Sequence, residues 1–213
     1  MRHFLLNSTV IALLLGLFSC DGILDDIYDD EVPAMTEEAF TENTVSVDAS
    51  SYQQWVYIDF HNKKVETVAI VDGESPVAEE PENWDIALHR FQVKTNGGSA
   101  IETSFSTISE FSANPHLPKE GWKEDTWYEE SVITDLSGMM SGQIKYTPSY
   151  LNDVVCGWIT SSGMPPEYTT SDKVYVIRLS DNTCLAIRLD SYMDNNGTKG
   201  FLKLSYSYPV RNE

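Results

Sequence analysis

The C-terminal third of the chain carries the feature that most limits its fold: apolar and polar residues alternate with a period of two. In residues 201–208, Leu202, Leu204, Tyr206 and Tyr208 fall on one face of an extended chain, and the polar residues between them fall on the other. A helix, with a period of about 3.6 residues, would spread these side chains around its axis. The alternation therefore predicts a half-buried β-strand.

Turn residues join this region into antiparallel strands. The apolar segments 173–179 and 183–190 are separated by Ser180-Asp181-Asn182, and Asp and Asn are favoured in tight turns. Asn195-Asn196-Gly197 forms a second turn signal ahead of residues 201–208. The pattern predicts a hairpin with Asp181-Asn182 at its turn, followed by a further strand.

Similar strand patterns occur at Tyr52–Phe60, Val65–Val71 and Trp84–Val93, whereas only Asp125–Met140 offers room for a short helix. About 170 residues from Thr44 onward suffice for one substantial core. No repeat or Pro/Gly/Ser-rich linker divides them. We expect a mainly β fold, a single antiparallel β-rich domain over residues 44–213.

The N-terminus has the pattern of a cleaved export signal. Arg2 precedes an apolar run from Val10 to Phe18, and the small Ser19 stands directly before Cys20. We interpret residues 1–19 as a signal peptide. The residues around the cleavage point resemble the recognition box of bacterial lipoprotein processing, so we expect lipidation of Cys20. The alternative is a secreted protein cut beside a chance cysteine.

The segment 20–43 is strongly acidic and contains no Lys or Arg, which predicts a disordered tether. Acidic residues just after a lipidated cysteine resemble the surface-export signal of Bacteroidetes lipoproteins. We therefore expect a lipid anchor in the outer membrane and exposure at the cell surface, with periplasmic retention as the alternative. The nine acidic residues are Asp21, Asp25, Asp26, Asp29, Asp30, Glu31, Glu37, Glu38 and Glu42.

Net charge argues against polyanionic partners. The chain carries a formal charge of −19, and negative charge remains in excess after residue 44. Nucleic acid and anionic lipid head groups are repelled by such a surface. Cys156 and Cys184 both lie in apolar, strand-like runs, and the sequence leaves open whether they form a disulfide or pack as free thiols.

No motif of a hydrolase, a nucleotide-binding loop, a zinc site or a metalloprotease occurs, so we do not expect an enzyme. The three histidines after the tether are each alone in their segment. We interpret His61 and His89 as packing residues, because a solitary strand histidine is more often satisfied locally than a ligand. His116, in a proline-flanked loop, is a reserve ligand.

Two loops place methionine beside glycine: Ser137–Gly142, with Met139 and Met140, and Ser161–Pro166, with Met164. Glycine permits close approach of a flat ligand, and a proline after Met164 restricts its backbone. Thioethers aimed from such loops suit a soft metal or heme iron, although methionine also fills gaps in a core. Aromatic residues nearby can wall a porphyrin or belong to the core: Trp127, Tyr128, Tyr146, Tyr150, Trp158 and Tyr168.

Several segments together resemble the HmuY-like heme-binding lipoproteins (hemophores) of Bacteroidetes. The resemblance covers roughly Thr44 to Val210. It is strongest in the segments 84–90, 94–98, 164–168, 173–178, 199–202 and 206–209. It implies an all-β fold with a ligand cleft between protruding loops, which agrees with the period-two pattern.

The resemblance also implies a function. The protein would capture heme (iron protoporphyrin IX) from host heme-carrier proteins and deliver it to an outer-membrane TonB-dependent heme receptor. Cofactor-binding residues would be Met139, Met140, Met164 and Tyr146, with Met140 and Met164 as the iron ligands. The choice between Met139 and Met140 stays open. The competing function is a surface glycan- or protein-binding adhesin that uses exposed Trp and Tyr.

Overall fold

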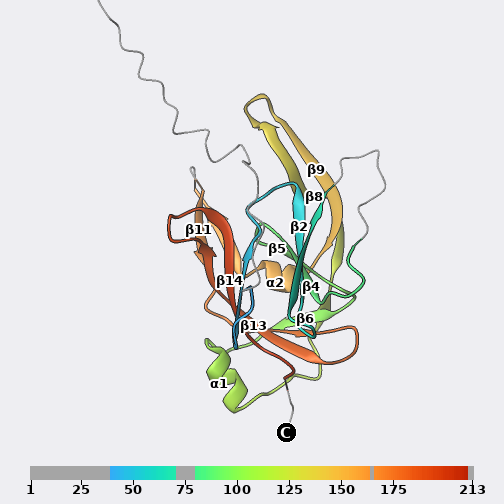
Figure 1. Cartoon of the computed structure of the whole chain (residues 1–213), viewed down its shortest axis with the longest axis vertical. Helices are drawn as coiled ribbons and strands as arrows, with labels where there is room; N and C mark the ends of the chain where they lie inside the picture. Colours follow the sequence, from blue (N-terminus) through green and yellow to red (C-terminus); the bar gives the residue numbers. More distant parts are fainter. Residues whose placement is uncertain (1–38, 71–79, 164–165, 211–213) are drawn as a thin grey trace, which may run out of the picture. The chain divides into compact units, whose positions relative to one another are not determined.

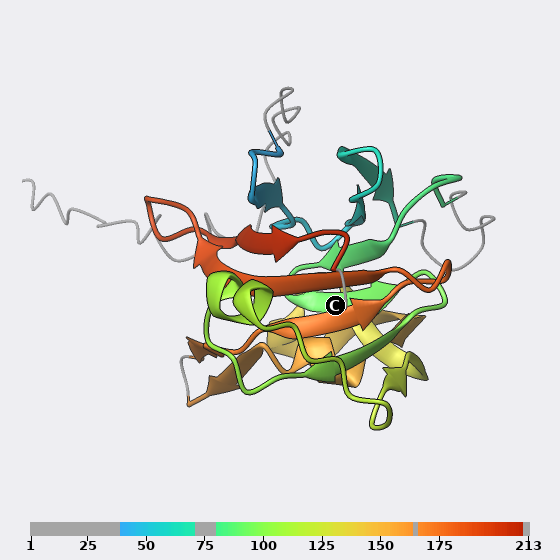
Figure 2. The ribbon, with the colours of Figure 1, turned by 90° about the horizontal axis from the view of Figure 1, so that it is seen from below.

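A computed structural model describes residues 39–70, 80–163 and 166–210 of the chain. Its larger sheet has six strands, and every neighbouring pair runs antiparallel. In spatial order these strands are β1 (Thr44–Asp48), β14 (Lys199–Ser207), β13 (Cys184–Met193), β12 (Tyr175–Arg178), β6 (Ser99–Glu102) and β7 (Lys123–Glu124). The long strands β13 and β14 lie side by side through its middle (Figures 1 and 2).

A four-stranded sheet and two separate hairpins complete the β structure. The sheet runs β3 (Lys64–Ala69), β2 (Gln54–Asp59), β4 (Ile86–His89) and β5 (Gln92–Thr95). The hairpins are β8 (Thr126–Gly138) with β9 (Gln143–Leu151), and β10 (Ile159–Ser162) with β11 (Glu167–Thr170). The short helices are α1 (Ile108–Ala113), α2 (Asp153–Cys156) and the 3-10 turn η1 (Met139–Ser141). The prediction of a mainly antiparallel β fold is confirmed.

The main core lies between the two sheets. Val56 and Ile58 of β2 meet Ile187 of β13 and Leu204 of β14 in one buried cluster, together with the fully buried Trp158. The indole Nε1 of Trp158 donates to the Phe91 carbonyl at 2.8 Å, so its polar atom is satisfied inside the core. Burial of this continuous apolar surface is the dominant stabilising contribution.

The other face of β2 is also buried, which explains why this strand is apolar on both faces. Trp55 and Tyr57 point away from the main core and pack in a second cluster with Trp84, Val132 and Leu151. Val132 comes from β8, and Leu151 ends β9. The β8–β9 hairpin therefore covers the outer face of the four-stranded sheet at the base of the hairpin.

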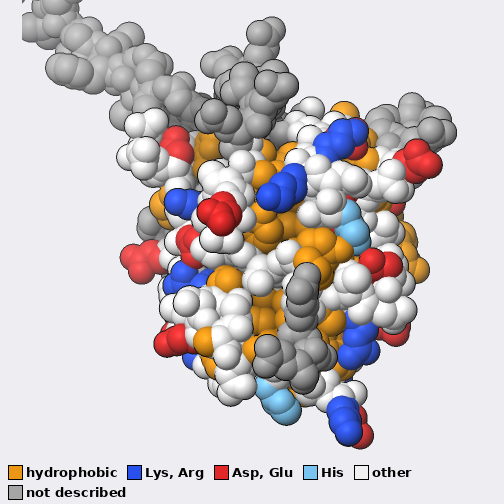
Figure 3. Space-filling view, turned by 60° about the horizontal axis from the view of Figure 1, so that its bottom comes forward, with side chains coloured by type: hydrophobic (Ala, Val, Ile, Leu, Met, Phe, Trp, Pro, Cys, Tyr) orange, Lys and Arg blue, Asp and Glu red, His pale blue; other side chains and the backbone are white. Residues whose placement is uncertain are grey.

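The helix α1 closes the end of the domain opposite the projecting tip of β8–β9 (Figure 1). The Thr107 hydroxyl caps it by accepting from the Glu110 N–H at 3.1 Å, and Phe111 is buried in a third cluster with Val174 and Cys184. Figure 3 brings this end forward and shows hydrophobic side chains gathered in the middle of the face, with charged side chains around them.

The predicted turns are confirmed. Asp181-Asn182 connects β12 and β13: the Asn182 N–H donates to the Leu179 carbonyl at 2.9 Å, and Asn182 has a φ of +68°. Asparagine tolerates this left-handed conformation better than most residues. Gly197, at a φ of +86°, turns the chain between β13 and β14.

Three local predictions are wrong. Asp125–Met140 contains strand β8 instead of a helix, because its aromatic and β-branched residues pair along β9 and cover the sheet. Trp84–Val93 is two paired strands, β4 and β5, joined at Arg90 with a φ of +55°. Cys156 lies in helix α2 instead of a strand, since Asn152 caps that helix by accepting from the Val155 N–H at 3.2 Å.

Cys156 and Cys184 are both free thiols. The Cys156 sulfur accepts from the Val93 N–H at 3.2 Å, and burial raises the pKa of this thiol to about 12. Cys184 packs in the third cluster. Phe40, near the start of the described residues, contacts the rings of Phe60 and Tyr206, so packing begins before Thr44. Within the described ranges, no helix has the length and apolar character needed to span a membrane.

Candidate functional site

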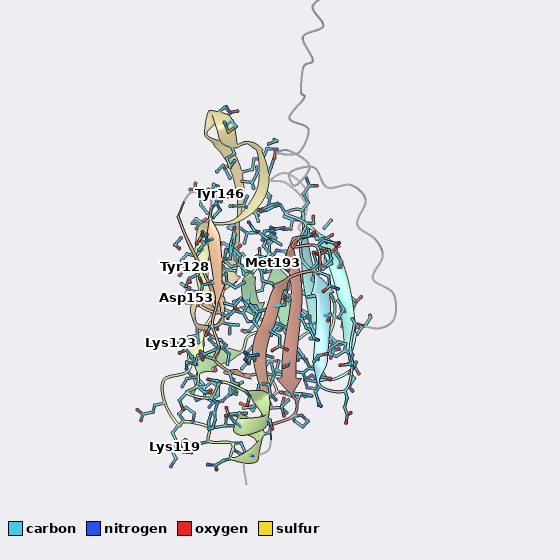
Figure 4. All side chains as sticks on the ribbon, turned by 90° about the vertical axis from the view of Figure 1, so that its left-hand side faces the viewer. Lys119, Lys123, Tyr128, Tyr146, Asp153 and Met193 are labelled. Atoms are coloured by element: carbon cyan, nitrogen blue, oxygen red, sulfur yellow. The ribbon has the colours of Figure 1, made fainter. Side chains whose placement is uncertain are left out.

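The β8–β9 hairpin projects beyond the rest of the described domain (Figure 1). Its strands pair from Thr126–Leu151 at the base to Gly138–Gln143 at the tip, with register irregularities that bend the ribbon. In Figure 4, Tyr146 lies on the projecting part, while Tyr128 and Asp153 lie at the base, where the Tyr128 hydroxyl donates to the Asp153 carboxylate at 2.8 Å.

The tip is a tight turn built on two glycines. A side chain at Gly138 would place its Cβ 2.2 Å from the Gln143 carbonyl oxygen, so only glycine fits there. Gly142 adopts a φ of +74° and donates its N–H to the Met139 carbonyl at 3.0 Å. The Ser141 hydroxyl donates to the Gly138 carbonyl at 2.9 Å. These contacts fix the backbone that carries the two methionines of η1.

The two methionines are exposed. Met139 is 46% exposed and Met140 is 94% exposed. The alternative that these residues fill gaps in a core is therefore wrong. A thioether that contacts almost nothing in the protein is available as a donor to a soft metal.

The second predicted ligand loop belongs to β10–β11, whose strands pair from Ile159–Thr170 to Ser162–Glu167. Gly163 begins the turn with a φ of +84°. Met164 and Pro165 lie outside the described residues. Met164 as an iron ligand therefore stays a prediction.

The aromatic residues divide into two groups. Trp158 is fully buried, and Tyr168 packs against the main core, so both belong to the domain interior. The exposed group lies on the two strands of the hairpin: Trp127, Tyr128, Tyr146 and Tyr150. Tyr146, paired with Ile133, is 43% exposed and is the member nearest in sequence to the tip.

Neither His89 nor His116 lies in the loops that carry the methionines. His89 is 1% exposed and bonds to the Tyr52 carbonyl, and burial lowers its pKa to about 4, so it packs as a neutral ring, as predicted. His116 lies in the exposed loop that follows α1, and as a reserve ligand it stays a prediction.

His61 has a stronger role than ring packing. Its Nδ1 lies 3.0 Å from Asp85 and its Nε2 lies 3.0 Å from Asp181, while its ring contacts Tyr208. Donor atoms of Asp59, His61 and Asp85 lie within 4.8 Å of one another, close enough for a metal ion. Asp59 already accepts from Asn62, however, and Asp85 accepts from the Phe60 N–H, so this group links the β2–β3 turn to the β12–β13 turn.

A cavity of about 540 Å³ lies on the outer face of the four-stranded sheet, against the base of β8–β9. Lys94 lies at its floor, and Trp84 and Ile70 contribute to its wall. Trp127 and Tyr150, 46% and 54% exposed, also line it, and their rings meet edge to face at 4.9 Å. This size is typical of a small-molecule site.

Sequence reasoning missed this cavity, although its signal was present. The segments 84–90 and 94–98 are among those in which the family resemblance is strongest, and both supply lining residues, Trp84 and Lys94–Gly98. The first segment contains β4 and the second begins in β5, so the two come together because these strands pair.

These features define a class: an all-β domain of two packed sheets with hairpins that project from it. The HmuY protein family model matches residues 51–206, and the chain belongs to this family. No curated protein matches the chain.

Solved structures have the same fold. A protein of Bacteroides vulgatus, provisionally named a HmuY-like heme-binding protein, is 42% identical, with a TM-score of 0.73 and coverage of 79% of this chain and 92% of that one. A Bacteroides fragilis protein, provisionally named a lipoprotein, is 37% identical, with a TM-score of 0.74 and coverage of 79% and 90%. The apo HmuY analog of Tannerella forsythia, at 24% identity, a TM-score of 0.66 and coverage of 76% and 93%, shows the fold alone.

Proposed function

We propose that this protein is a heme-binding lipoprotein of the cell surface that holds heme iron through methionine. The observation that carries the proposal is Met140, 94% exposed at the rigid tip of a projecting hairpin. Its thioether is accessible to a ligand at the end of the hairpin. Membership of the HmuY family and the name of the Bacteroides vulgatus relative support heme as the ligand.

The donor chemistry of the tip fits heme iron. A thioether is a neutral, soft ligand, and methionine ligation raises the reduction potential of heme. Met140 would supply one such ligand and Met164 the second, with Met139 as the substitute for Met140. Tyr146, on the same projecting hairpin, would contact the porphyrin or replace a lost ligand.

The remaining parts of the proposal concern location and partners. Cys20, outside the described residues, would carry the lipid anchor in the outer membrane, and the acidic segment 20–43 would hold the domain away from it. Heme would come from host heme-carrier proteins and pass to an outer-membrane TonB-dependent receptor. Both transfers move heme from one protein to another and leave its covalent structure unchanged.

Replacement of the ligands tests the site. In hemin titrations followed by the Soret band, the double variant Met140→Ala with Met164→Ala should lose the low-spin ferrous spectrum, while Met140→Ala alone is rescued in part by Met139. Met193→Ala is the matched control, because Met193 is 38% exposed but lies on β13 (Figure 4). An unchanged spectrum in the double variant would transfer the ligand role to Tyr146. A hemin spectrum that the wild-type protein leaves unchanged would favour the adhesin function.

A further inference from the structure

The floor of the cavity beside β8–β9 holds a buried positive charge. Lys94 is only 9% exposed, and its ammonium lies over the rings of Trp55, Tyr57 and Trp84 at 4.6, 5.0 and 5.3 Å from their centroids. The faces of aromatic rings attract a cation, but a buried charge also needs an anionic partner. Burial lowers the pKa of Lys94, and Glu80 counteracts this effect.

That partner is held by two donors. The carboxylate oxygen Oε1 of Glu80 accepts from Lys94 Nζ at 2.5 Å and from the Tyr57 hydroxyl at 3.3 Å. The ammonium also donates to the Tyr57 oxygen at 3.1 Å, which ties the two donors together. Lys94 lies on β5 and Tyr57 on β2, and both strands pair with β4 between them. The two side chains thus form a preformed receptor for one carboxylate oxygen.

The donors and the acceptor differ in how firmly they are held. The side chain of Lys94 is 11% exposed, whereas that of Glu80 is 45% exposed. Glu80 also lies outside the helices and strands of the described chain, while both donors belong to the four-stranded sheet. Among the described residues, Glu80 is the one carboxylate that forms an ion pair with Lys94. Another carboxylate can therefore replace it without leaving the buried ammonium unpaired.

Part of the remaining lining is apolar or aromatic and suits a flat body for that carboxylate, while Glu124 and Asp125 also line the cavity. Trp84 and Ile70 form the wall near the floor, and the exposed Trp127 and Tyr150 lie at the hairpin side. Aromatic rings stack favourably with other rings, and the volume of about 540 Å³ accommodates one small organic molecule. A cationic ligand is disfavoured, because the ammonium of Lys94 already occupies the aromatic floor.

We propose that this cavity is a second binding site, separate from the methionine tip, which takes a small aromatic carboxylate whose acid group replaces Glu80 on Lys94 and Tyr57. In the absence of such a ligand, Glu80 occupies the receptor and competes with it. This proposal does not depend on heme binding, because it uses none of the residues of the hairpin tip.

Calorimetric titration of the purified chain with indole-3-acetate tests the proposal, with indole-3-acetamide as the uncharged probe. Glu80→Gln should tighten indole-3-acetate binding about tenfold, because a neutral amide competes less well than a carboxylate for the buried ammonium. The affinity for indole-3-acetamide should not increase in this variant. Glu82→Gln, a nearby exposed glutamate that does not line the cavity, should leave both affinities unchanged.

Loss of the donors gives the opposite result. Lys94→Met should weaken indole-3-acetate binding at least about tenfold, since it removes the charged donor. Tyr57→Phe, which removes only a hydroxyl, should weaken it a few-fold and keeps the test valid if Lys94→Met fails to fold. The proposal is overturned if acid and amide bind alike, if Glu80→Gln binds no tighter, or if neither probe binds.

Discussion

At the scale of single residues, His61 shows how one side chain can join two sheets. It contacts Asp85 beside β4 and Asp181 in the β12–β13 turn, each at 3.0 Å. Burial acts to lower the pKa of His61, but hydrogen bonds to Asp181 and Asp85 outweigh this effect and raise it above 6.5. Hydrogen bonds from Thr183 and His61 lower the pKa of Asp181 from 3.8 to about 2.

These shifts predict a stability maximum in mildly acidic solution. The contribution of His61 is complete below its ordinary pKa of 6.5 and is lost as pH rises through its raised value in the folded state. That of Asp181 is complete above 3.8 and is lost as pH falls toward about 2. Both are present between these limits. His61→Gln should therefore lower the free energy of unfolding most in this pH range, by no more than about 1 kcal/mol because the ion pair is partly exposed.

Urea denaturation of wild type and His61→Gln at several pH values measures this difference. We expect it to be largest near the middle of the window and to shrink in alkaline solution. His116→Gln, on the exposed loop after α1, serves as the control. A difference that is independent of pH would mean that the ring contact with Tyr208, not the charge of His61, accounts for the role of this residue.

At the scale of elements, the tip of β8–β9 depends on the absence of a side chain at Gly138. A Cβ atom there would lie 2.2 Å from the Gln143 carbonyl oxygen, and backbone atoms cannot yield as a flexible side chain does. Gly138→Ala should displace η1 and weaken hemin binding about tenfold, because a shift of about an ångström in a ligand is enough to reduce its interaction strongly. The melting temperature of the domain should change little.

Gly197→Ala is the matched control for this change. It introduces strain at a φ of +86° in the β13–β14 turn but meets no atom within 4 Å. It should lower the melting temperature slightly and leave hemin affinity unchanged. Equal losses of hemin affinity in the two variants would contradict a specific role for the tip.

The elements also show where sequence patterns were sufficient. Period-two alternation identified β2, β12, β13 and β14 because each buries at least one complete face. The pattern failed at β8, where charged residues such as Glu129 and Glu130 interrupt it on a largely exposed ribbon. Pairing with β9 stabilises that strand, and such a partner is not visible in a local window.

The same limit applies to the sites. Met139 and Met140 could be proposed from their glycine neighbours, since a tight exposed turn is a local property. The carboxylate receptor of Lys94 and Tyr57 could not be predicted from the sequence. It depends on the pairing of β2, β4 and β5 and on the approach of Glu80. Sequence alone also gave His61 no partner, as Asp181 is distant in the chain.

At the scale of the whole molecule, the proposed function requires a lipid anchor at Cys20. Cys20→Ala should release the protein from the membrane fraction, because the polar, acidic segment that follows provides no other apolar attachment. Cell fractionation with immunoblotting measures the distribution, and Cys184→Ala, which removes a buried thiol of the β structure, is the control. Continued partition of Cys20→Ala into membranes would place the anchor elsewhere.

The central claim is that methionine thioethers at the hairpin tips hold heme iron, and the redox dependence of hemin binding tests it most directly. Because thioether ligation favours ferrous over ferric iron, the wild-type chain should bind heme at least about tenfold more tightly after reduction by dithionite, with a low-spin ferrous spectrum. Equal or weaker binding in the ferrous state would contradict methionine ligation, and no binding in either state would contradict the heme function itself.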